Sequence, residues 1–367
     1  MIHFLMPRDE DYTVREYLKL WGRGVGGGMS ILHYEDLPAR STLPGGTYIL
    51  TALDHLTPEG RGVVADLCDQ LARAGPDART LNSPSAVLRR FELLEELHRR
   101  GLNRHRAARA EGDLGGLRFP VFLREEHWHT GALSPLLRTP AELQAALARA
   151  IVRAHRLSEL LVVEFTDTAD AEGFFRKYAA FIVGSEIVPR GLAHGREWML
   201  KFAGTEFTAS MVREERDYVF ENPHERELRR IFEIARIEYG RIDYSVKDGV
   251  LQTWEINSNP TIGRGQRPPS GAIPAELEPL RHANKERFYQ KFREAFEGID
   301  TGGQSPRPIP IRFSPESLRQ LRAMTQVERK GGRLPALRKA LRPIRPLLDR
   351  IAGAVSPILV KAARRVG

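Results

Sequence analysis

The sequence predicts an α/β fold in which an N-terminal unit of alternating strands and helices precedes two further domains. Three observations support this prediction. Short apolar runs alternate with amphipathic helical patterns over the first 80 residues, and a buried-looking strand, LLVVEF at 160–165, follows a helical pattern in the middle of the chain. Two strand patterns near residue 250 are joined by Asp248 and Gly249, a strong hairpin signal. A length of 367 residues accommodates two or three domains.

The N-terminal unit is expected to extend to about residue 85. Its strand candidates are 2–6, 29–34 and 48–53, and its first helix candidate is 12–21. A second helix is expected to run to about Ala74, with Thr57 as its cap and Pro58 at its first position.

The following segment is expected to open a new domain with a helix that ends at Gly101. Apolar residues recur there at helical spacing, at Val87, Leu88, Phe91, Leu94 and Leu97. A strand at 118–124 (RFPVFLR), a helix at 140–157 and the strand at 160–165 come next. They are followed by two short strands at 178–184 and 186–190, a helix at 224–239 that ends at Gly240, and hairpin strands at 242–246 and 251–256.

Composition and charge exclude several classes of protein. Apolar residues make up 41% and charged residues 28%, as in ordinary globular proteins, and the single cysteine, Cys68, excludes an intramolecular disulfide. No apolar run approaches the roughly 18 residues of a membrane span, and 1–6 is too short for a signal peptide, so a cytoplasmic protein is expected. Residues 301–367 hold 15 Lys and Arg against 3 Asp and Glu, a local +12, so residues 1–300 carry −3 and the basic character of the chain belongs to this tail.

The segment with the most chemical information is 241–260, RIDYSVKDGVLQTWEINSNP. Asp243 lies early on the first hairpin strand, and Glu255 and Asn257, two residues apart on the second, face the same side. Carboxylate and amide oxygens are hard ligands that suit Mg²⁺ shared with ATP phosphates. The alternative interpretation is an ordinary exposed hairpin with polar ends.

The order RIDY, DG and WEINSNP resembles the magnesium-binding end of ATP-grasp proteins such as D-alanine ligases and other carboxylate-amine ligases. The resemblance covers about 82–262 and includes three earlier segments: NSPSAVLRRFELLEELHRRGL, FPVFLR and LLVVEF. It implies ATP and Mg²⁺ as cofactors, with Asp243, Glu255 and Asn257 as metal ligands and Arg241 beside the transferring phosphoryl group. It also implies an ATP-grasp fold with a pre-grasp domain at 1–85, a central domain at 86–158, a C-terminal grasp domain at 159–300, and a linker and tail at 301–367.

The resemblance also implies nucleotide contacts, although this chain departs from the family where lysines are usual. Arg90 and Arg124 stand at those positions, and a guanidinium still binds phosphate. Glu164 and the backbone of Phe165 are expected at the adenine. For Arg90 the alternative is a solvated helix face, and for Glu164 it is a carboxylate satisfied by its neighbours.

The region after 165 is expected to supply further cations. Lys201, in WMLKF, is the best candidate for phosphate, and Arg190 is a second candidate for phosphate or the acceptor carboxylate, with a surface position as its alternative.

These features imply an ATP-dependent ligase that activates a small-molecule or peptide carboxylate as an acylphosphate, which an amine then attacks. No Ser/His/Asp or Cys/His arrangement is recognisable, in agreement with a reaction that needs no protein nucleophile. Two alternatives remain: a small-molecule kinase with the same fold, and a non-catalytic nucleotide-binding or scaffold protein, suggested by arginine at both lysine positions.

The tail is expected to consist of a Pro- and Gly-rich linker, 301–314, and short basic amphipathic helices interrupted by prolines. One interpretation packs these helices onto the body. The other gives them a partner, which would be an anionic membrane surface with the protein peripheral to it, or an acidic partner. Nucleic acid is the least supported partner, because the tail holds no Tyr or Trp for stacking.

Overall fold

The computed structural model describes residues 1–20, 28–129, 131–153, 155–201, 204–262, 273–300, 307–322, 360–361 and 363. The chain divides into two compact units. The first unit joins Met1–Leu88 to Thr168–Met324, and the second joins Arg89–Asp167 to Thr325–Gly367. The first unit thus takes in most of the predicted pre-grasp and C-terminal grasp domains, while the finer division into three domains stays a prediction.

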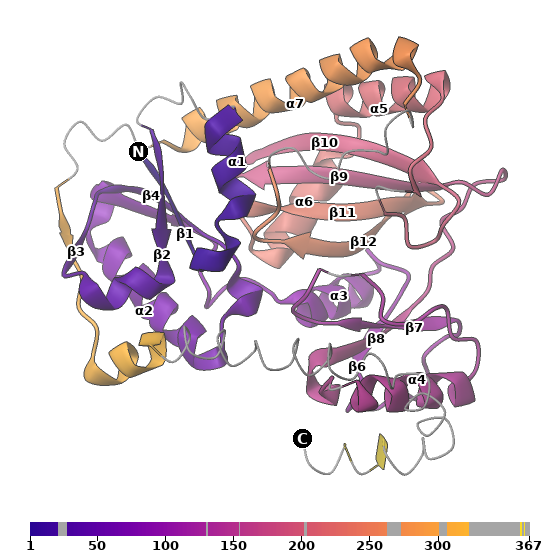
Figure 1. Ribbon diagram of the computed structural model, residues 1–367, viewed down its shortest axis with the longest axis horizontal. Coiled ribbons are helices and arrows are strands. Elements are labelled where there is room, and N and C mark those ends of the chain that lie inside the picture. Colours follow the sequence, from indigo (N-terminus) through magenta and orange to yellow (C-terminus); the bar gives the residue numbers. More distant parts are fainter. Residues whose placement is uncertain are drawn as a thin grey trace. The chain divides into compact units, whose positions relative to one another are not determined.

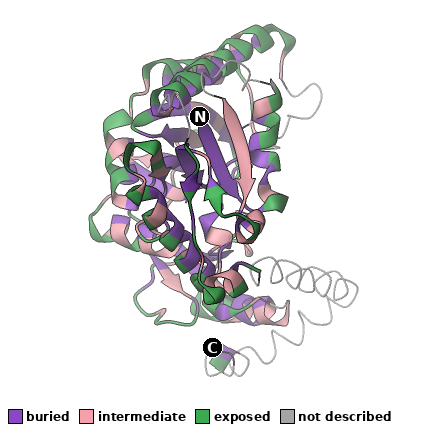
Figure 2. Ribbon diagram, turned by 90° about the vertical axis from the view of Figure 1, so that its left-hand side faces the viewer, coloured by how far each residue is buried: buried purple, intermediate pink, exposed green. Residues whose placement is uncertain are grey.

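The first unit begins with a four-stranded parallel sheet, as the alternation of strands and helices predicted (Figure 1). The strands, in the order β2-β1-β4-β5, are β1 (Ile2–Met6), β2 (Met29–His33), β4 (Gly46–Leu50) and β5 (Ala78–Leu81). Every residue of β1 and β4 is buried, in agreement with their continuous apolar runs, whereas β2 is of intermediate exposure (Figure 2).

Two helices connect these strands close to the predicted boundaries. They are α1 (Tyr12–Leu20) and α2 (Pro58–Arg73). The Thr57 hydroxyl accepts a hydrogen bond from the backbone N–H of Gly60, and Pro58 occupies the first helical position. The predicted helix start is therefore confirmed. Short 3-10 helices cover Arg8–Glu10, Tyr34–Ala39, Leu53–His55, Gly75–Asp77, Leu157–Glu159 and Ala275–Leu277.

The second sheet of the first unit is antiparallel, with the order β10-β9-β11-β12 (Figure 1). Its strands are β9 (Phe175–Val183), β10 (Glu186–Gly195), β11 (Tyr239–Lys247) and β12 (Val250–Asn257). Gly184, at φ +64°, makes the tight turn between β9 and β10. Both predicted strand pairs are present, and the β9–β10 pair is longer than predicted.

Three helices accompany this sheet: α5 (Ala209–Glu221), α6 (Glu225–Ala235) and α7 (Glu278–Ile299). The predicted end of α6 at Gly240 is wrong. The helix ends at Ala235 because Arg236 adopts the left-handed conformation, with φ +54°. Gly240 instead lies within β11, where an added Cβ would come 2.9 Å from the Asn257 carbonyl oxygen.

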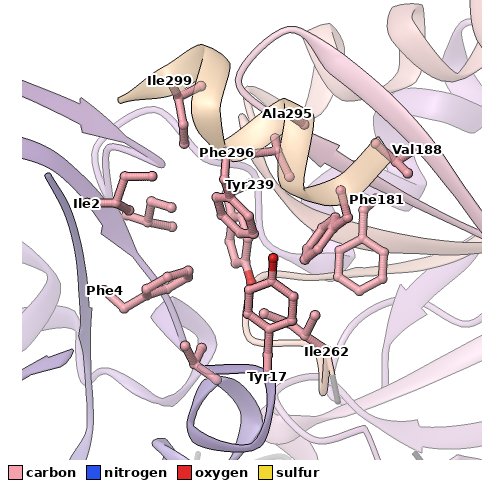
Figure 3. Packing of buried hydrophobic residues seen from close by; sticks show 14 of the residues in the cluster. Ile2, Phe4, Tyr17, Phe181, Val188, Tyr239, Ile262, Ala295, Phe296 and Ile299 are labelled. Atoms are coloured by element: carbon pink, nitrogen blue, oxygen red, sulfur yellow. The ribbon is translucent and has the colours of Figure 1, made fainter. Parts of the chain in front are cut away.

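One hydrophobic core joins the two sheets of the first unit. Figure 3 shows Phe4 of β1 and Tyr17 of α1 meeting Tyr239 of β11 and Phe296 of α7. The Phe4 ring packs edge-on against Tyr239 and Phe296, with centroids 5.5 and 5.8 Å apart. Such aromatic pairs add about 1 kcal/mol each beyond the area they bury. The segments before 88 and after 168 therefore form a single folding core.

Asn82 adds a polar connection between the same two sheets. This buried residue follows β5 and has φ +65°. Its Nδ2 donates to the carbonyls of Leu50 (3.1 Å) and Tyr239 (2.7 Å), and its Oδ1 accepts from the backbone N–H groups of Glu238 and Tyr239. A single buried amide side chain thus satisfies four backbone groups.

The second unit contains a three-stranded antiparallel sheet in the order β6-β8-β7. Its elements are α3 (Arg90–Arg99), β6 (Ala107–Arg109), β7 (Val121–Glu125), α4 (Pro140–Val152) and β8 (Leu160–Glu164). Alternate residues of β7 and β8 pack with α4 in a core that also includes Val360. The helix predicted to end at Gly101 is present as α3, but it ends at Arg99 and begins at Arg90, later than the spacing from Val87 indicated. The buried strand predicted at 160–165 is confirmed within one residue.

Part of the predicted linker is packed against the body. Strand β13 (Ile309–Pro310) pairs with β3 (Thr42–Leu43), and Ile309 and Ile311 are buried. The Gln70 side chain makes two hydrogen bonds to the backbone of Arg312. Its Nε2 donates to the carbonyl, and its Oε1 accepts from the N–H. Residues 315–322 are helical, and the predicted tail helices at 334–357 lie outside the described residues. No helix within the described ranges is both long and apolar enough to cross a bilayer.

Candidate functional site

The site candidate with the best-defined geometry lies on the β11–β12 hairpin of the first unit. Asp248 and Gly249 form its two-residue turn, with φ +48° and +75°, and Lys247 pairs directly with Val250. Positive φ at both positions is what a tight hairpin turn requires. The turn therefore fixes the register of the residues next to it, and an irregularity between Asp243 and Tyr244 then sets the register of the strand ends.

This register places the four motif residues in two facing pairs. Asp243 lies directly opposite Glu255, and Arg241 lies directly opposite Asn257. Because directly opposed side chains project to the same side of a sheet, and residues two apart do as well, all four share one face. An irregularity in the register after Asp243 lies between these pairs and the turn.

Asp243 is the most enclosed member of the set, with 7% of its surface exposed. Arg241 Nε donates to its Oδ1 at 2.8 Å, and Lys177 Nζ of β9 lies 3.6 Å from its Oδ2. Burial lowers the pKa of the Arg241 guanidinium, but the nearby Asp243 and Glu255 carboxylates outweigh it and raise that pKa. The face is thus a compact arrangement of charges of both signs.

Asn257 is held in place by the segment that follows it. Its Oδ1 accepts a hydrogen bond from the backbone N–H of Asn259 at 2.7 Å. The Asn259 side chain in turn bonds to Thr13 and Glu10, which lie in and before α1. Gly240 on the adjacent strand leaves room for the Asn257 backbone. The end of β12 is therefore anchored by the N-terminal part of the same unit.

Three of the four residues carry oxygen atoms of the kind that bind a hard divalent cation. Asp243, Glu255 and Asn257 offer carboxylate and amide oxygens from facing positions, the type of ligand that Mg²⁺ takes. Among the described residues no cluster of three or more His, Cys, Asp or Glu suits a metal ion. Two carboxylates and an amide are few ligands, as expected where phosphate oxygens complete the coordination of Mg²⁺.

The other predicted residues of the first unit lie in different surroundings. Arg190 is partly buried on β10, with its guanidinium 4.6 Å from the centre of the Phe288 ring. Lys201 is exposed in the segment between β10 and α5, and its carbonyl accepts from the Gly204 N–H. The structure brings Arg241 and the three oxygen ligands together, whereas Lys201 has no hydrogen bond or ion pair to them among the described residues.

Arg90, in the second unit, has a buried side chain that is already engaged. It begins α3, is 7% exposed, and donates from Nη1 to the carbonyls of Glu125, Glu126 and Trp128. Nη2 lies 2.9 Å from His129 Nδ1. The guanidinium therefore shapes the loop after β7, and its burial rules out the alternative of a solvated helix face.

Glu164, at the end of β8, is 1% exposed and is satisfied by its neighbours. Its carboxylate accepts from Arg118 Nη2 at 2.8 Å and from the backbone N–H groups of Arg118 and Arg106. Burial raises the pKa of this carboxyl, but these hydrogen bonds outweigh it and lower the pKa. This geometry agrees with the alternative interpretation of a satisfied carboxylate.

Phe165 and Arg124 lie close by in the same unit. The Phe165 N–H donates to the Pro120 carbonyl at 2.9 Å, so this donor serves the protein backbone. Arg124 is on β7, is 6% exposed, and is paired in register with Leu161 of β8. Its side chain lies on the face of the sheet that is turned away from the α4 core. Val121 and Leu123 point to the opposite face, because side chains alternate along a strand, and they pack in that core.

Lys177 falls in the region after 165 that was expected to supply cations, and the structure places it on the same face of β9 as Phe181, which pairs with Arg241. Two further cations of the first unit were missed by the sequence interpretation. Arg281 and Lys285 are four residues apart on α7, a helix that the sequence analysis did not predict. Its aromatic residues at spacings of four, Phe288, Phe292 and Phe296, were the available signal.

Comparisons with known proteins give similarity in structure alone. No protein-family model matches the chain, and no curated protein matches its sequence. The chain is similar to D-alanine–D-alanine ligase from Bacillus anthracis complexed with ATP, at 12% identity and a TM-score of 0.43, over 80% of this chain and 99% of that one. It is also similar to the D-alanine–D-alanine ligase from Coxiella burnetii, at 8% identity and a TM-score of 0.47, over 90% and 99% of the two chains.

A third solved structure is that of the ATP-grasp ligase PsnB complexed with minimal precursor. Its identity to this chain is 12% and its TM-score 0.43, over 78% of this chain and 98% of PsnB. All three of these structures are described as ligases, and the last description names ATP-grasp. The α/β class predicted from the sequence is confirmed by the sheets and helices described above.

Proposed function

We propose that this protein is an ATP- and Mg²⁺-dependent ligase of the ATP-grasp type, which joins a carboxylate to an amine through an acylphosphate. The observation that carries the proposal is the pairing of Asp243 with Glu255 and of Arg241 with Asn257 on one face of an antiparallel sheet. An ordinary exposed hairpin has no need for a buried aspartate flanked by two cations.

In this proposal Asp243, Glu255 and Asn257 hold Mg²⁺, which neutralises phosphate charge when it is bound. Arg241 and Lys177 orient Asp243 and place positive charge beside the transferring phosphoryl group. Arg190 and Lys201 are proposed to add cations for the acceptor and the phosphates. Most of the rate would come from positioning and fixed charges.

The reaction has two balanced steps. A carboxylate oxygen of the acceptor attacks the γ-phosphorus of ATP, and the bond to the β-phosphate oxygen breaks, giving ADP and an acylphosphate. The amine nitrogen then attacks the acyl carbon, inorganic phosphate leaves, and the amine loses a proton. The chain needs to supply no nucleophile of its own in either step.

For nucleotide contacts in the second unit we propose Arg124 first. Its buried position on β7 is that of a positioned cation. Arg90, Glu164 and the Phe165 N–H are each engaged by protein groups, so their proposed contribution is to shape the nucleotide-binding segments. A fall in ATP affinity in Arg124→Ala supports this assignment, and unchanged affinity refutes it.

A screen for ADP and phosphate release with pooled carboxylates and amino acids tests the proposed reaction. We expect Mg²⁺-dependent release by the wild type, an amide in the products, and loss of release in Asp243→Asn. The matched control is Asp248→Asn, the same change at the exposed hairpin turn. A phosphorylated product without an amide indicates a kinase, and ATP binding without turnover indicates a nucleotide-binding scaffold.

We also propose that the basic tail binds an anionic surface and holds the protein peripherally at a membrane. The support is its local excess of 15 Lys and Arg over 3 Asp and Glu. Full-length protein should sediment with vesicles containing phosphatidylserine at low salt and leave them at high salt, since the Debye length falls to about 3 Å at 1 M. Equal sedimentation with neutral vesicles would refute the proposal.

A further inference from the structure

A second group of cations lies beside the candidate site, where α7 runs along α5 and β10 (Figure 1). Its members are Arg190 of β10 and Arg281 and Lys285 of α7. Arg281 and Lys285 are one helical turn apart and therefore project from the same side of α7. Arg190 lies at an irregularity of the β9–β10 pairing, between Pro189 and Gly191, and such bulges redirect a side chain out of the regular pattern.

Arg281 is the buried centre of this group. It is 7% exposed, and its Nε and Nη1 atoms are buried without a hydrogen-bond partner among the described residues. Its guanidinium lies 4.5 Å from the centre of the Phe207 ring. Buried guanidinium donors that make no hydrogen bond cost free energy, so a bound anion would remove this cost.

One carboxylate lies within this group, and it is shared. Glu215 Oε2 of α5 is 3.7 Å from Arg281 Nε, too long for a hydrogen bond, and accepts from Asn284 Nδ2 at 3.1 Å. The same carboxylate lies close to the backbone at Gly191, next to Arg190. Glu278, at the start of α7, is a second carboxylate near Lys285, so the three cations face two carboxylates and keep an excess of positive charge.

Arg190 connects this group to the proposed catalytic face. Its guanidinium lies over the rings of Phe288 and Tyr289 and makes no hydrogen bond to a described residue. Burial, together with the positive charges of Arg241 and Arg281, lowers its pKa. Burial and the charges of Arg281 and Arg190 likewise lower the pKa of Lys285. Arg190 is therefore close enough to both Arg241 and Arg281 for their positive charges to act on it.

We propose that Arg190, Arg281 and Lys285 form a subsite for a second carboxylate of the acceptor, so that the protein acts on dicarboxylic acids. This inference rests on the proposed ligase function and adds the substrate class to it. One carboxylate is activated beside Arg241, and the other is held by the α7 cations. Guanidinium groups suit this role because their planar donors match a carboxylate in a bidentate manner.

Binding of matched acids to the full-length protein tests the subsite. The probes are the dicarboxylates from malonate to adipate and their mono-amides, which keep the size but lose one charge. In calorimetry with Mg-ATP present, we expect the best dicarboxylate to bind at least roughly tenfold more tightly than its mono-amide, the effect of one charge-assisted contact. Equal affinity for the members of each pair would overturn the proposal.

The residues are tested by Arg281→Gln and Lys285→Gln, each expected to reduce that preference about tenfold. Lys291→Gln, the same change on an exposed turn of α7, should keep it. Lys285 is exposed, so its variant tests the proposal even where Arg281→Gln fails to fold, and Arg281→Lys should restore part of the preference. If Lys285→Gln and Lys291→Gln changed the preference for a dicarboxylate equally, the result would count against the subsite. Displacement of every dicarboxylate by inorganic phosphate would also count against it.

The failure of this inference can be separated from failure of the proposed function. If ADP release proceeds equally well with dicarboxylates and mono-amides, the ligase stands and the subsite falls. If dicarboxylates bind in a manner that depends on Lys285 but no amine supports ADP release, the subsite stands and the ligase falls.

Discussion

Asn82 illustrates how much a single buried amide contributes to the first unit. It connects Leu50, Glu238 and Tyr239 through four hydrogen bonds, from a left-handed conformation. We predict that Asn82→Ala lowers the free energy of unfolding by about 3 kcal/mol, because buried backbone groups lose their partners. Urea unfolding followed by circular dichroism measures this change.

The control for this prediction is Asn222→Ala. Asn222 also has a left-handed backbone, with φ +46°, but it is partly exposed and its two side-chain hydrogen bonds are long, at 3.4 Å. The backbone strain of alanine is thus shared by both variants, and the difference between them reports the hydrogen bonds. Equal destabilisation would mean that conformation, and not bonding, explains Asn82.

The sequence could predict the members of the candidate site because they lie on one hairpin. Asp243, Glu255 and Asn257 are brought together by a turn of two residues, and the period of a strand determines their common side. Lys177 and Arg281 could not be found in this way. Strand pairing brings Lys177 to Asp243, and helix packing brings Arg281 to Glu215. These contacts join residues far apart in the sequence, so no local spacing reveals them.

At the scale of elements, the predictions hold where a local signal is strong. Thr57 and Pro58 start α2, Asp248 and Gly249 turn the hairpin, and Gly101, with φ +69°, follows the end of α3. The end of α6 was misplaced because Arg236, a residue with no glycine-like preference, takes the left-handed conformation. The packing around Arg236, and not its intrinsic propensity, determines this backbone conformation.

The buried carboxyl of Glu164 on β8 leads to a prediction about how stability depends on pH. The Glu164 carboxyl has a pKa below its usual value, because hydrogen bonds from Arg118 and two backbone amides outweigh its burial. A carboxyl with a lowered pKa stabilises the folded state above its unfolded pKa of about 4.3 and loses that contribution as pH falls below it. We predict that Glu164→Gln makes the stability of the second unit less dependent on pH between about 5 and 3.

Thermal unfolding of the wild type and the variant at several pH values checks this prediction. Glu95→Gln, at an exposed position of α3, serves as the matched control and should keep the wild-type profile. A Glu164→Gln profile parallel to that of the wild type would show that the ion pair with Arg118 contributes no pH-dependent stability.

At the scale of the whole molecule, the chain is organised in two units whose segments are discontinuous in sequence. The sequence predicted consecutive domains, since composition and spacing carry no information about a core that joins Phe4 to Phe296. The packing of the tail is likewise not predictable from its composition. Ile309 pairs with β3, and Val360 belongs to the core of the second unit, so a basic composition does not by itself define a free segment.

The most direct test of the central claim is Mg²⁺-dependent ATP binding by the wild type, Glu255→Gln and Glu238→Gln. Glu238 is exposed in the same unit and provides the same chemical change away from the catalytic face. A ligand that binds the native state at a concentration of 100 times its Kd stabilises it by about 2.7 kcal/mol, so the shift in Tm reports affinity. We predict a large Mg-ATP shift for the wild type and Glu238→Gln and a much smaller one for Glu255→Gln; equal shifts in all three proteins would contradict the assignment of this hairpin as the metal and nucleotide site.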